Sequence, residues 1–478
     1  MSVIGNRSRR AALVLAVAVL AAGGAAPAVA EDDIEAIKGQ LESLRQEYDQ
    51  RLRSLEESLR AAEERARQAQ EEAASAVAAP AAPAAPAGPV VAAAARAFNP
   101  AISIILDGRY AAFSKDPEAY ELPGFLLEEE AGLGDEGLSL GHTEFYASGN
   151  IDDRFYGQLV FVLDQHEGAV ELELEEAFVQ SLGLGHGLTL RAGRFYSALG
   201  YLNEQHEHAW DFADAPLVYR GLFGHRQLSD DGLRASYVAP FDTFLEVGAE
   251  LFRGGRFPAA GSGHDGVGAW SAFAHIGGDI GIEHSWQLGL GQWRADDVNG
   301  RAGGGHGHDG EDAGAAVETP SFSGDSRIRA LDLVYKWAPL GNPNVRQFKF
   351  QFEYLARREG GRVVLLNSDP FESTDYRGRQ SGWYAQAAYR FLPRWRTGVR
   401  YDRLRADNSG SDADVLAEAG LDDEGHRPRR YGLMLEWLPS EFSRLRLQYN
   451  RDKSSADADD QVFLQYTHSL GAHGAHSY

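Results

Sequence analysis

The sequence contains no cysteine and only two methionines among its 478 residues. Without cysteine the chain forms no disulfide bond, binds no metal through thiolates and uses no cysteine nucleophile. Glycine is abundant, with 54 residues, and aromatic side chains make up 10% of the chain. This composition favours many short strands and turns over a helical enzyme core.

Positive charge and long hydrophobic runs are also scarce. The chain has 46 Lys and Arg against 70 Asp and Glu, so its formal net charge is −24. General nucleic-acid binding is excluded, because it needs a positive surface that displaces counterions. After residue 30 no stretch approaches the roughly 18 apolar residues of a transmembrane helix. Any further membrane contact then needs a surface helix or a β-barrel.

The residues before the main domain divide into segments of different composition. Residues 1–30 have a basic start, an apolar stretch over 11–22 and small residues at 28–30, which is typical of a secretory signal peptide. Residues 79–97 are rich in Ala and Pro and predict an extended, semi-rigid linker. The sequence therefore predicts export and a spacer before residue 98.

Residues 31–78, between these two segments, repeat apolar side chains every seven positions among Glu, Arg and Gln. Such a stripe predicts an amphipathic helix that forms a coiled coil with a drifting register. Because one helix cannot bury its stripe alone, we expect self-association. The alternative is a lone helix that lies on the main domain or on another partner.

From Ala101 onward the hydrophobic period becomes two. In residues 346–354, for example, aromatic side chains alternate with Lys349, Gln351 and Glu353. Sixteen strands are expected, near residues 101–113, 138–148, 154–163, 170–181, 188–196, 232–238, 243–252, 267–276, 282–294, 326–337, 346–357, 381–391, 394–403, 430–438, 443–452 and 460–470.

The connections between these strands alternate in length. The long ones are expected at 114–137, 197–231, 253–266, 295–325, 358–380 and 404–429. Short periplasmic turns and longer extracellular loops are the pattern of an outer-membrane barrel. The predicted fold class is therefore an all-β transmembrane barrel of about 16 antiparallel strands over residues 98–478, preceded by the α-helical coiled coil. An even strand count places the coiled coil in the periplasm of a Gram-negative bacterium.

Three runs of sequence resemble known proteins: 98–117 (FNPAISIILDGRYAAFSKDP), 190–220 (LRAGRFYSALGYLNEQHEHAWDFADAPLVYR) and 469–478 (SLGAHGAHSY). They resemble a proteobacterial group often labelled zinc-regulated TonB-dependent outer membrane receptors, over essentially all of residues 98–478. A coiled coil before a sixteen-stranded barrel also looks like the phosphate-selective porin family. That second resemblance implies a homotrimer, held through residues 31–78 and the barrel wall.

The longest connection, 197–231, is the first candidate for a pore constriction. In general porins the loop at this position folds into the lumen, and the aromatic content of 197–231 agrees with such a place. The alternative is an aromatic lid over the mouth. The candidate residues are Tyr201, His206, His208, Trp210, Asp211, Asp214 and Arg220.

Strand alternation also predicts which charges line the lumen. A basic wall on the later strands would favour anions such as phosphate or carboxylates, because rings of one charge select ions of the other. The alternative is a ladder of Arg–Glu pairs without selectivity. The cations expected on the inner side are Arg191, Lys349, Arg390, Arg396, Arg400, Arg430, Arg444 and Arg446.

Histidines beside carboxylates indicate a candidate metal site. His306, His308 and Asp309 lie in a Gly-rich loop, and residues 206–208 read His-Glu-His. Neutral imidazole with carboxylate suits Zn²⁺. The alternative is a flexible surface loop that happens to contain histidine. No other cofactor is expected.

No enzyme is expected: the sequence has no H-E-x-x-H or GxxxxGK[ST] pattern. The predicted function is a porin-like channel for passive diffusion of small hydrophilic solutes or ions. The alternative is a zinc-responsive receptor that captures metal with His-bearing extracellular loops. Expected partners are outer-membrane lipid, lipopolysaccharide near the acidic loops, and the cell wall through the helix.

Overall fold

The computed structural model describes residues 100–471, except residues 129, 167–168, 226, 261–265, 304–318, 369–370 and 424. The chain divides into two compact units, residues 1–88 and 89–478, and the described residues belong to the second. The predictions for the signal peptide, the coiled coil and the linker lie outside the described residues. The same holds for the candidate metal ligands His306, His308 and Asp309.

Seventeen strands make up one antiparallel sheet in the described part of the chain. They are β1 (Ala101–Phe113), β2 (Gly137–Leu140), β3 (Thr143–Asn150), β4 (Phe155–His166), β5 (Ala169–Ser181), β6 (Leu188–Tyr196), β7 (Ser229–Val238), β8 (Phe244–Phe252), β9 (Ala269–Ile280), β10 (His284–Ala302), β11 (Thr319–Trp337), β12 (Gln347–Leu366), β13 (Glu372–Leu392), β14 (Trp395–Gly410), β15 (Arg429–Ser440), β16 (Ser443–Lys453) and β17 (Asp459–Gly471).

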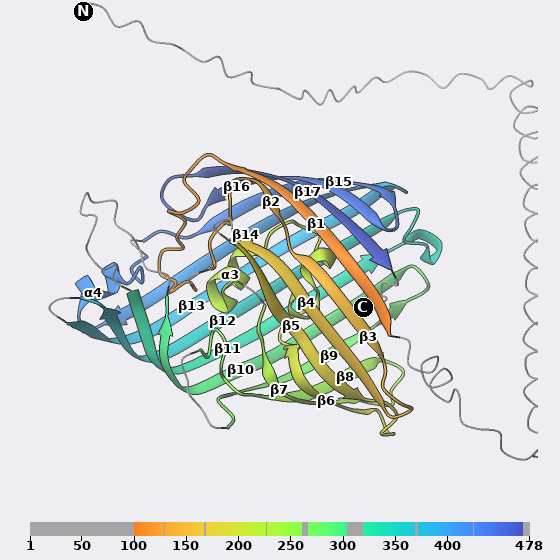
Figure 1. The fold of residues 1–478 in the computed structure, drawn as a ribbon, viewed down its shortest axis with the longest axis horizontal. Helices are drawn as coiled ribbons and strands as arrows, with labels where there is room; N and C mark the ends of the chain where they lie inside the picture. The colour runs from red at the N-terminus through yellow and green to blue at the C-terminus, as the bar shows by residue number, and fades with distance from the viewer. Residues whose placement is uncertain are drawn as a thin grey trace, which may run out of the picture. The chain divides into compact units, whose positions relative to one another are not determined.

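The sheet closes on itself, because β1 pairs with β17 from Ser103↔Gly471 to Phe113↔Gln461. β2 and β3 both pair with β1 and follow each other along it, so they form one interrupted strand of the wall. The described residues therefore form a closed barrel of sixteen antiparallel strands, as predicted. Figure 1 shows these strands wrapped around the short helix α3.

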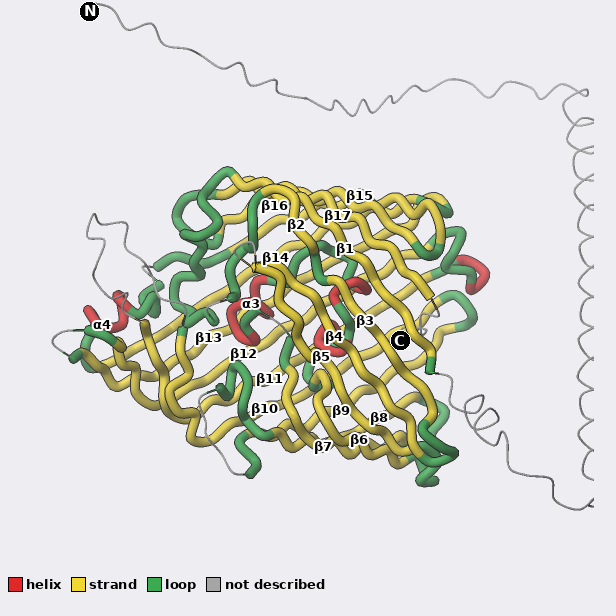
Figure 2. The backbone as a smooth tube through the Cα atoms, viewed as in Figure 1, coloured by secondary structure: helices red, strands yellow, loops and turns green. Residues whose placement is uncertain are grey.

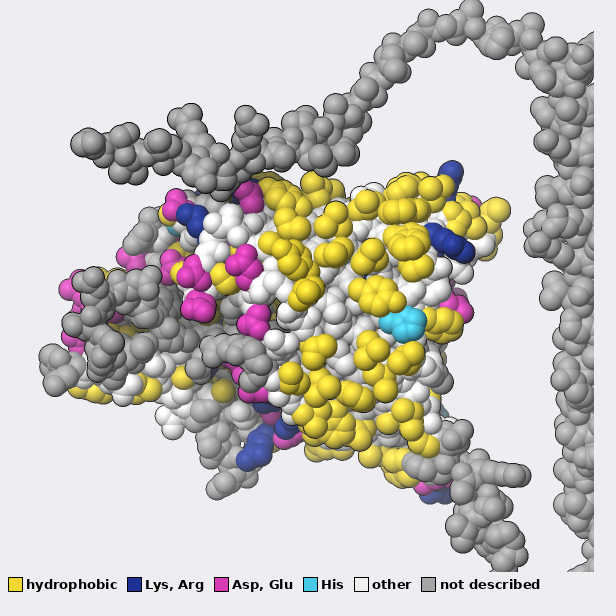
Figure 3. Space-filling view, turned by 45° about the horizontal axis from the view of Figure 1, so that its top comes forward, with side chains coloured by type: hydrophobic (Ala, Val, Ile, Leu, Met, Phe, Trp, Pro, Cys, Tyr) yellow, Lys and Arg dark blue, Asp and Glu magenta, His cyan; other side chains and the backbone are white. Residues whose placement is uncertain are grey.

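The wall is apolar outside and polar inside. On β15, Leu433 is 55% exposed, whereas the neighbouring Arg430 and Glu436 are fully buried. Hydrophobic side chains cover the outer face of the strands, and acidic side chains gather toward the end that carries the long connections (Figure 3). This distribution reverses that of a soluble protein and matches a barrel surrounded by lipid.

Five strands are longer than the sequence predicts. β10 to β14 contain 16 to 21 residues each, so three expected loops are shorter or partly strand: 295–325, 358–380 and 404–429. Between β12 and β13 only residues 367–371 remain as a connection. The paired backbone of β12 and β13 continues to Leu365↔Glu372, although the alternation of apolar and polar residues has already faded there.

The helices in the described part of the chain are short. They are η1 (Leu202–Glu204), η2 (Glu207–Ala209), α3 (Leu217–Phe223), η3 (Pro339–Gly341) and α4 (Ala413–Glu418). None of them is long and apolar enough to cross a membrane. η1, η2 and α3 belong to residues 197–228, and Figure 2 shows helices enclosed by the strands.

Candidate functional site

Residues 197–228, here called the inner loop, connect β6 to β7 through the inside of the barrel. The loop leaves β6 at Tyr196 and contacts the opposite wall: α3 packs against β12, β13 and β14. All seven residues of α3 are buried. The structure thus places the loop within the lumen and not above the mouth. That it limits the passage of solutes stays a prediction.

One side of the inner loop carries two aspartates to the strands opposite. Asp211 forms ion pairs with Lys349, at 3.0 Å, and with Arg396. Burial alone would raise the pKa of Asp211, but Lys349 and Arg396 hold it well below its usual range. Their positive charge therefore keeps Asp211 ionised inside the barrel.

Asp214 lies deeper in the same network. Its carboxylate is 2.6 Å from Arg400 and 2.8 Å from Arg430, and it accepts a 2.9 Å hydrogen bond from Asn450. Burial alone would raise the pKa of Asp214, but the positive charges of Arg400 and Arg430 outweigh this effect and hold the pKa well below its usual range. Six inward-facing cations of β12, β14, β15 and β16 are here called the basic wall: Lys349, Arg396, Arg400, Arg430, Arg444 and Arg446.

Each arginine of this wall that the loop leaves partly free meets a carboxylate of the wall itself. Arg396 and Arg446 approach Glu436 at 2.8 and 2.9 Å. Arg400 lies 3.1 Å from Asp402, and Arg444 lies 3.6 Å from Glu436. The contacts resemble the paired ladder more than an unpaired cationic row. Ion selectivity remains untested.

The other two predicted lumen cations also lie on the inner side. Arg191 donates hydrogen bonds to Gln180 and stacks on Phe178, with 4.2 Å between its guanidinium carbon and the ring centre. Arg390 pairs in register with Arg396 and so shares its face of the sheet.

Glu353 on β12 holds the start of the inner loop without a cation. It accepts hydrogen bonds from the backbone N–H of Leu202, at 2.9 Å, and from the hydroxyl of Tyr219, at 2.8 Å. Tyr384 donates a third, at 2.5 Å. Gly200 makes this approach possible, because it has φ +91° and a Cβ there would lie 2.6 Å from the Glu353 carboxylate.

The remaining predicted constriction residues fill the space between the contacts of Asp211, Asp214 and Glu353. The ring of Tyr201 lies 5.3 Å from the Lys349 ammonium. Trp210 donates from its indole N–H to the carbonyl of Gln205 at 2.7 Å. Arg220 points toward residues 114–136, where it donates to the carbonyl oxygens at 131 and 132. All of them lie inside the barrel.

The opposite side of the inner loop meets a second group of charges. Glu144 on β3 and Glu175 and Glu176 on β5 point inward and are at most 4% exposed. We call these three carboxylates the acidic wall. His206 and His208 of the inner loop lie against it, so the loop turns its histidines to one wall and its aspartates to the other.

A β-bulge on β5 creates part of the acidic wall. Val160 pairs with Glu176 and Phe161 pairs with Leu174, so Glu175 is the extra residue. In a regular strand, adjacent residues point to opposite faces, yet Glu175 and Glu176 are both buried inside. Bulges re-aim side chains in this way and are frequent next to active sites.

A second irregularity interrupts the strand formed by β2 and β3. Gly108 pairs with Leu140 and Ile105 pairs with Glu144, so two residues of β1 oppose three of its neighbour. The outward face therefore changes from even to odd positions, with Leu140 and Phe145 both exposed. As a result His142 and Glu144 both lie inside the barrel.

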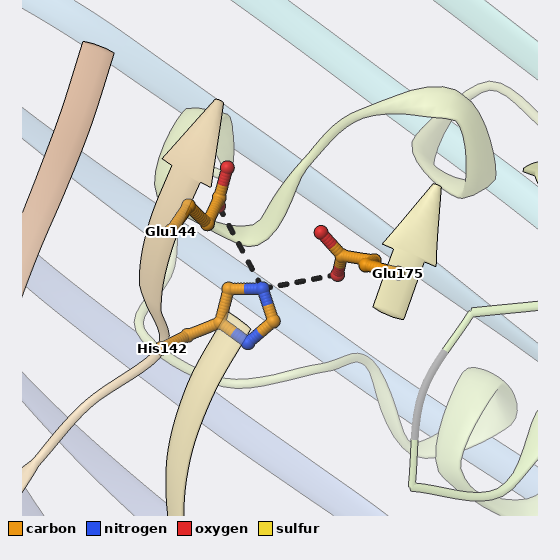
Figure 4. A group of neighbouring side chains, drawn as sticks. All are labelled: His142, Glu144 and Glu175. Atoms are coloured by element: carbon orange, nitrogen blue, oxygen red, sulfur yellow. Dashed lines mark ion pairs between the residues drawn. The ribbon is translucent and has the colours of Figure 1, made fainter. Parts of the chain in front are cut away.

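The histidines and carboxylates form a compact cluster. His142 Nε2 lies 3.0 Å from Glu175 and 3.7 Å from Glu144, as Figure 4 shows. His206 Nδ1 lies 3.2 Å from the other oxygen of Glu175. The donor atoms of His142, Glu144 and Glu175 all lie within 4.8 Å of one another. This is a ligand set of a kind that holds divalent transition metals.

The outer contacts of the cluster fix its orientation. His206 Nε2 lies 3.1 Å from Glu176, which also accepts a 2.6 Å hydrogen bond from the amide of Gln158. His208 Nδ1 lies 2.6 Å from Glu144. Burial alone lowers the pKa of His206, but Glu144, Glu175 and Glu176 raise it well above its usual value.

A polar cavity reaches this cluster. It has a volume of about 110 Å³ and lies between the inner loop and the inward faces of β1, β2 and β17. His142, Glu207 and Asp214 line it, together with Asp107 and Arg109 from β1. The space has room for a few water molecules, each of which takes about 30 Å³ in the liquid.

Sequence reasoning found only part of this site. It placed His206 and His208 in the lumen and noted their suitability for zinc, but it did not single out His142, Glu144 or Glu176. Strict alternation from Leu140 would direct His142 outward. A His-x-Glu sequence at an apparent strand was the available signal, but the bulges that turn both side chains inward have no clear mark in the sequence.

Comparison with known proteins gives a limited result. No family model matches the chain. A protein of Aquifex aeolicus (strain VF5), described as uncharacterized, is 28% identical over 416 residues, which cover 80% of this chain and 81% of that protein.

Several solved outer-membrane proteins have a similar arrangement. The anion-selective porin from Comamonas acidovorans has a TM-score of 0.47 and 11% identity, and the match covers 78% of this chain and 99% of that chain. The outer membrane channel DcaP of Acinetobacter baumannii has a TM-score of 0.46 and 13% identity, with 78% and 96% covered. Similarity at this level carries no argument about solutes, and the barrel is established by the strand pairings above.

The structure supports one of the two family resemblances and not the other. A porin-like barrel agrees with the sixteen strands, whereas the TonB-dependent label finds no support: outer-membrane transporters with a plugged lumen have 22 strands. The zinc-capturing alternative at His306, His308 and Asp309 also finds no support in these comparisons.

Proposed function

We propose that this chain is an outer-membrane, porin-like channel through which small hydrophilic solutes or ions diffuse passively. The observation that carries the proposal is the reversed wall, with apolar side chains such as Leu433 exposed outside and charged ones such as Arg430 buried inside. A closed barrel of this kind satisfies its backbone in lipid and encloses polar groups.

The inner loop makes the proposed channel narrow. It fills much of the lumen and leaves the polar cavity beside β1, β2 and β17, which is lined by charges of both signs. Such a lining suits small hydrated ions and polar solutes. A homotrimer, contacts with lipopolysaccharide and the periplasmic place of residues 31–78 belong to the same proposal.

Planar-bilayer conductance tests the channel. We expect stepwise current from the purified mature chain, and larger steps from Trp210→Ala, because this change removes a buried ring from the inner loop. The absence of steps from a protein with intact β-sheet circular dichroism would overturn the proposal. Hydrogen exchange of the strands in Trp210→Ala separates a wider channel from a misfolded one.

A pair of leucine substitutions tests the lipid-facing surface. Leu433 lies near the middle of β15 and Leu340 lies in η3, between β11 and β12, and both are exposed. Leu433→Arg is expected to destabilise the barrel in lipid vesicles by about 2–4 kcal/mol, and Leu340→Arg by at most about 1 kcal/mol. Equal stability of the two variants would show that β15 does not face hydrocarbon.

A further inference from the structure

The geometry points to a divalent metal site inside the barrel, held by His142, Glu144, Glu175 and His206, with Zn²⁺ as the ion that fits best. This site goes beyond the proposed channel and includes none of the residues of the Gly-rich run 303–312. Its ligands come from the wall, at the β2–β3 interruption and the β5 bulge, and from the inner loop. An ion there would join the loop to the wall.

The separations between donor atoms fit one small ion. Zn–N and Zn–O bonds of about 2.0–2.1 Å in a tetrahedron separate neighbouring ligand atoms by about 3.3 Å. His142 Nε2 lies 3.0 Å from Glu175 Oε1 and 3.7 Å from Glu144 Oε1. His206 Nδ1 lies 3.2 Å from Glu175 Oε2 and 3.5 Å from Glu144 Oε2. Each distance is close to the tetrahedral value, with His142 facing one oxygen of each carboxylate and His206 facing the other, so the two carboxylates lie between the two imidazoles.

The atoms that face one another lack hydrogen bonds. His142 Nε2, Glu144 Oε2 and Glu175 Oε1 are fully buried, and among the described residues they make only ion-pair contacts with one another and with His206, with no well-directed hydrogen bond. Buried polar atoms without partners are costly and need an explanation, such as an ion. A cation coordinated by these atoms would satisfy all three at once.

The charge of the cluster also calls for a cation. Within the described part of the chain, the ion pairs of Glu144, Glu175 and Glu176 are to histidine, and none is to Lys or Arg. Three buried carboxylates without a permanent positive charge are costly in a low-dielectric interior. A divalent ion supplies that charge and leaves the histidines neutral, which is the form that coordinates metal.

The contacts of His206 are those expected of a histidine that binds a metal through one ring nitrogen and donates a hydrogen bond from the other. While Nδ1 faces the cluster, Nε2 faces Glu176, and Glu176 is held by Gln158 and the backbone N–H of Tyr196. Histidines that bind metals commonly donate their second N–H to such a carboxylate, which fixes the ring and its tautomer. The polar cavity is lined by His142 and so borders the site.

Zinc titration of the full mature chain in detergent tests the proposal. The starting protein is stripped with EDTA and carries Ala in place of His306 and His308 of the Gly-rich run and of His473 and His476 of the C-terminal run 469–478. Calorimetry is expected to show one Zn²⁺ per chain, and His142→Gln with Glu175→Gln is expected to weaken binding by at least about 100-fold. X-ray absorption should show a shell of N and O atoms with imidazole scattering.

A matched histidine serves as the control. His275 also points into the barrel, is buried and forms an ion pair with Glu246 at 3.6 Å. His275→Gln is expected to bind zinc as tightly as the starting protein. Unchanged affinity in the double variant, or no zinc bound by the starting protein, would overturn the site and leave a network of histidine–carboxylate pairs.

Hydrogen exchange guards against a variant that fails to fold. Zinc added to the starting protein should protect the amides near residues 142–144 and 205–210, and this measurement needs no substitution in the cluster. Protection confined to other residues would contradict the proposal. Because both readouts are equilibrium binding, a negative result here leaves the channel proposal intact, and a protein without conductance can still bind zinc.

Discussion

The two walls that the inner loop contacts hold it by different chemistry. At the basic wall, loop aspartates meet arginine and lysine, for example Asp214 with Arg400 and Arg430. At the acidic wall, loop histidines meet carboxylates, for example His206 with Glu175. Arginine stays protonated under all ordinary conditions, whereas an imidazole is charged only when protonated and neutral when it binds a metal. One attachment is therefore permanent and the other depends on a proton or an ion.

The comparison implies that the loop has a fixed side and an adjustable side. Residues 211–217 should stay in place over a wide range of conditions, because their partners carry fixed charge. Residues 205–209 should respond to the occupancy of the cluster. The predictions below weaken one side at a time and ask whether the other side changes.

The largest effect is expected from Asp214→Asn. The change removes the charge that compensates two buried guanidinium groups, those of Arg400 and Arg430. Loss of one partner from a buried ion pair costs about 3–5 kcal/mol. We expect the free energy of local opening of residues 210–223 to fall by that amount, measured by hydrogen exchange in micelles.

An exposed pair provides the control for that experiment. Asp457 lies 3.1 Å from Lys115, with side chains 83% and 50% exposed. Asp457→Asn should change stability by less than about 1 kcal/mol, as for other surface pairs. If Asp214→Asn leaves exchange at 210–223 unaltered, the fixed side of the loop is not held by these charges.

A smaller decrease in the local opening free energy is expected from Glu353→Gln, which tests the hydrogen bonds that attach the inner loop to Glu353 without a cation. A hydrogen bond to a charged acceptor stabilises the folded state by about 1 kcal/mol more than a hydrogen bond to a neutral acceptor. Two of the donors to Glu353, Leu202 and Tyr219, belong to the inner loop, so the local opening free energy should fall by about 2 kcal/mol. Exchange of the amide of Leu202 gives the measurement. An unchanged rate would mean that the contact is absent in solution.

The sequence predicted the wall well because one physical rule governs it. Where lipid lies outside and water inside, every second side chain must be apolar, as on β15 with Tyr431, Leu433 and Leu435. Beyond the membrane that rule lapses, so the ends of β10 to β14 were missed. There, paired strands such as β12 run through residues 358–361, which read Arg-Glu-Gly-Gly.

The site was harder to predict than the wall. The inner loop could be recognised by its length and aromatic content, and its seven candidate residues do lie inside the barrel. The partners of the loop residues could not be predicted, because pairs such as Asp211 with Lys349 join residues that are far apart in the sequence. The bulge at Glu175 and the interruption at His142 change the face of each strand, and period-two reasoning has no means to place such a change.

On the acidic wall, Glu176→Gln should weaken zinc binding by about 10–100-fold without removing a ligand. Substitution of a supporting carboxylate typically has this effect, because the imidazole loses its orientation. Calorimetry of the zinc-stripped chain measures it. Gln180→Glu, on the same strand beyond the cluster, is the control and should leave the affinity unchanged. Equal affinity in Glu176→Gln would mean that Glu176 does not support His206.

The smallest effect is expected at the basic wall on mild acidification. The pKa values of Asp211 and Asp214 are held well below the usual range by their arginine and lysine neighbours. A group whose pKa is lowered by folding stabilises the folded state above its unfolded pKa of about 3.9, and this contribution is lost only as the pH falls through the lower folded value. Between pH 7.5 and 5 the opening free energy of residues 211–217 should therefore stay constant, after correction for intrinsic exchange. A decrease within this range would show that these aspartates take up protons there, and the contrast between a fixed and an adjustable wall would fail.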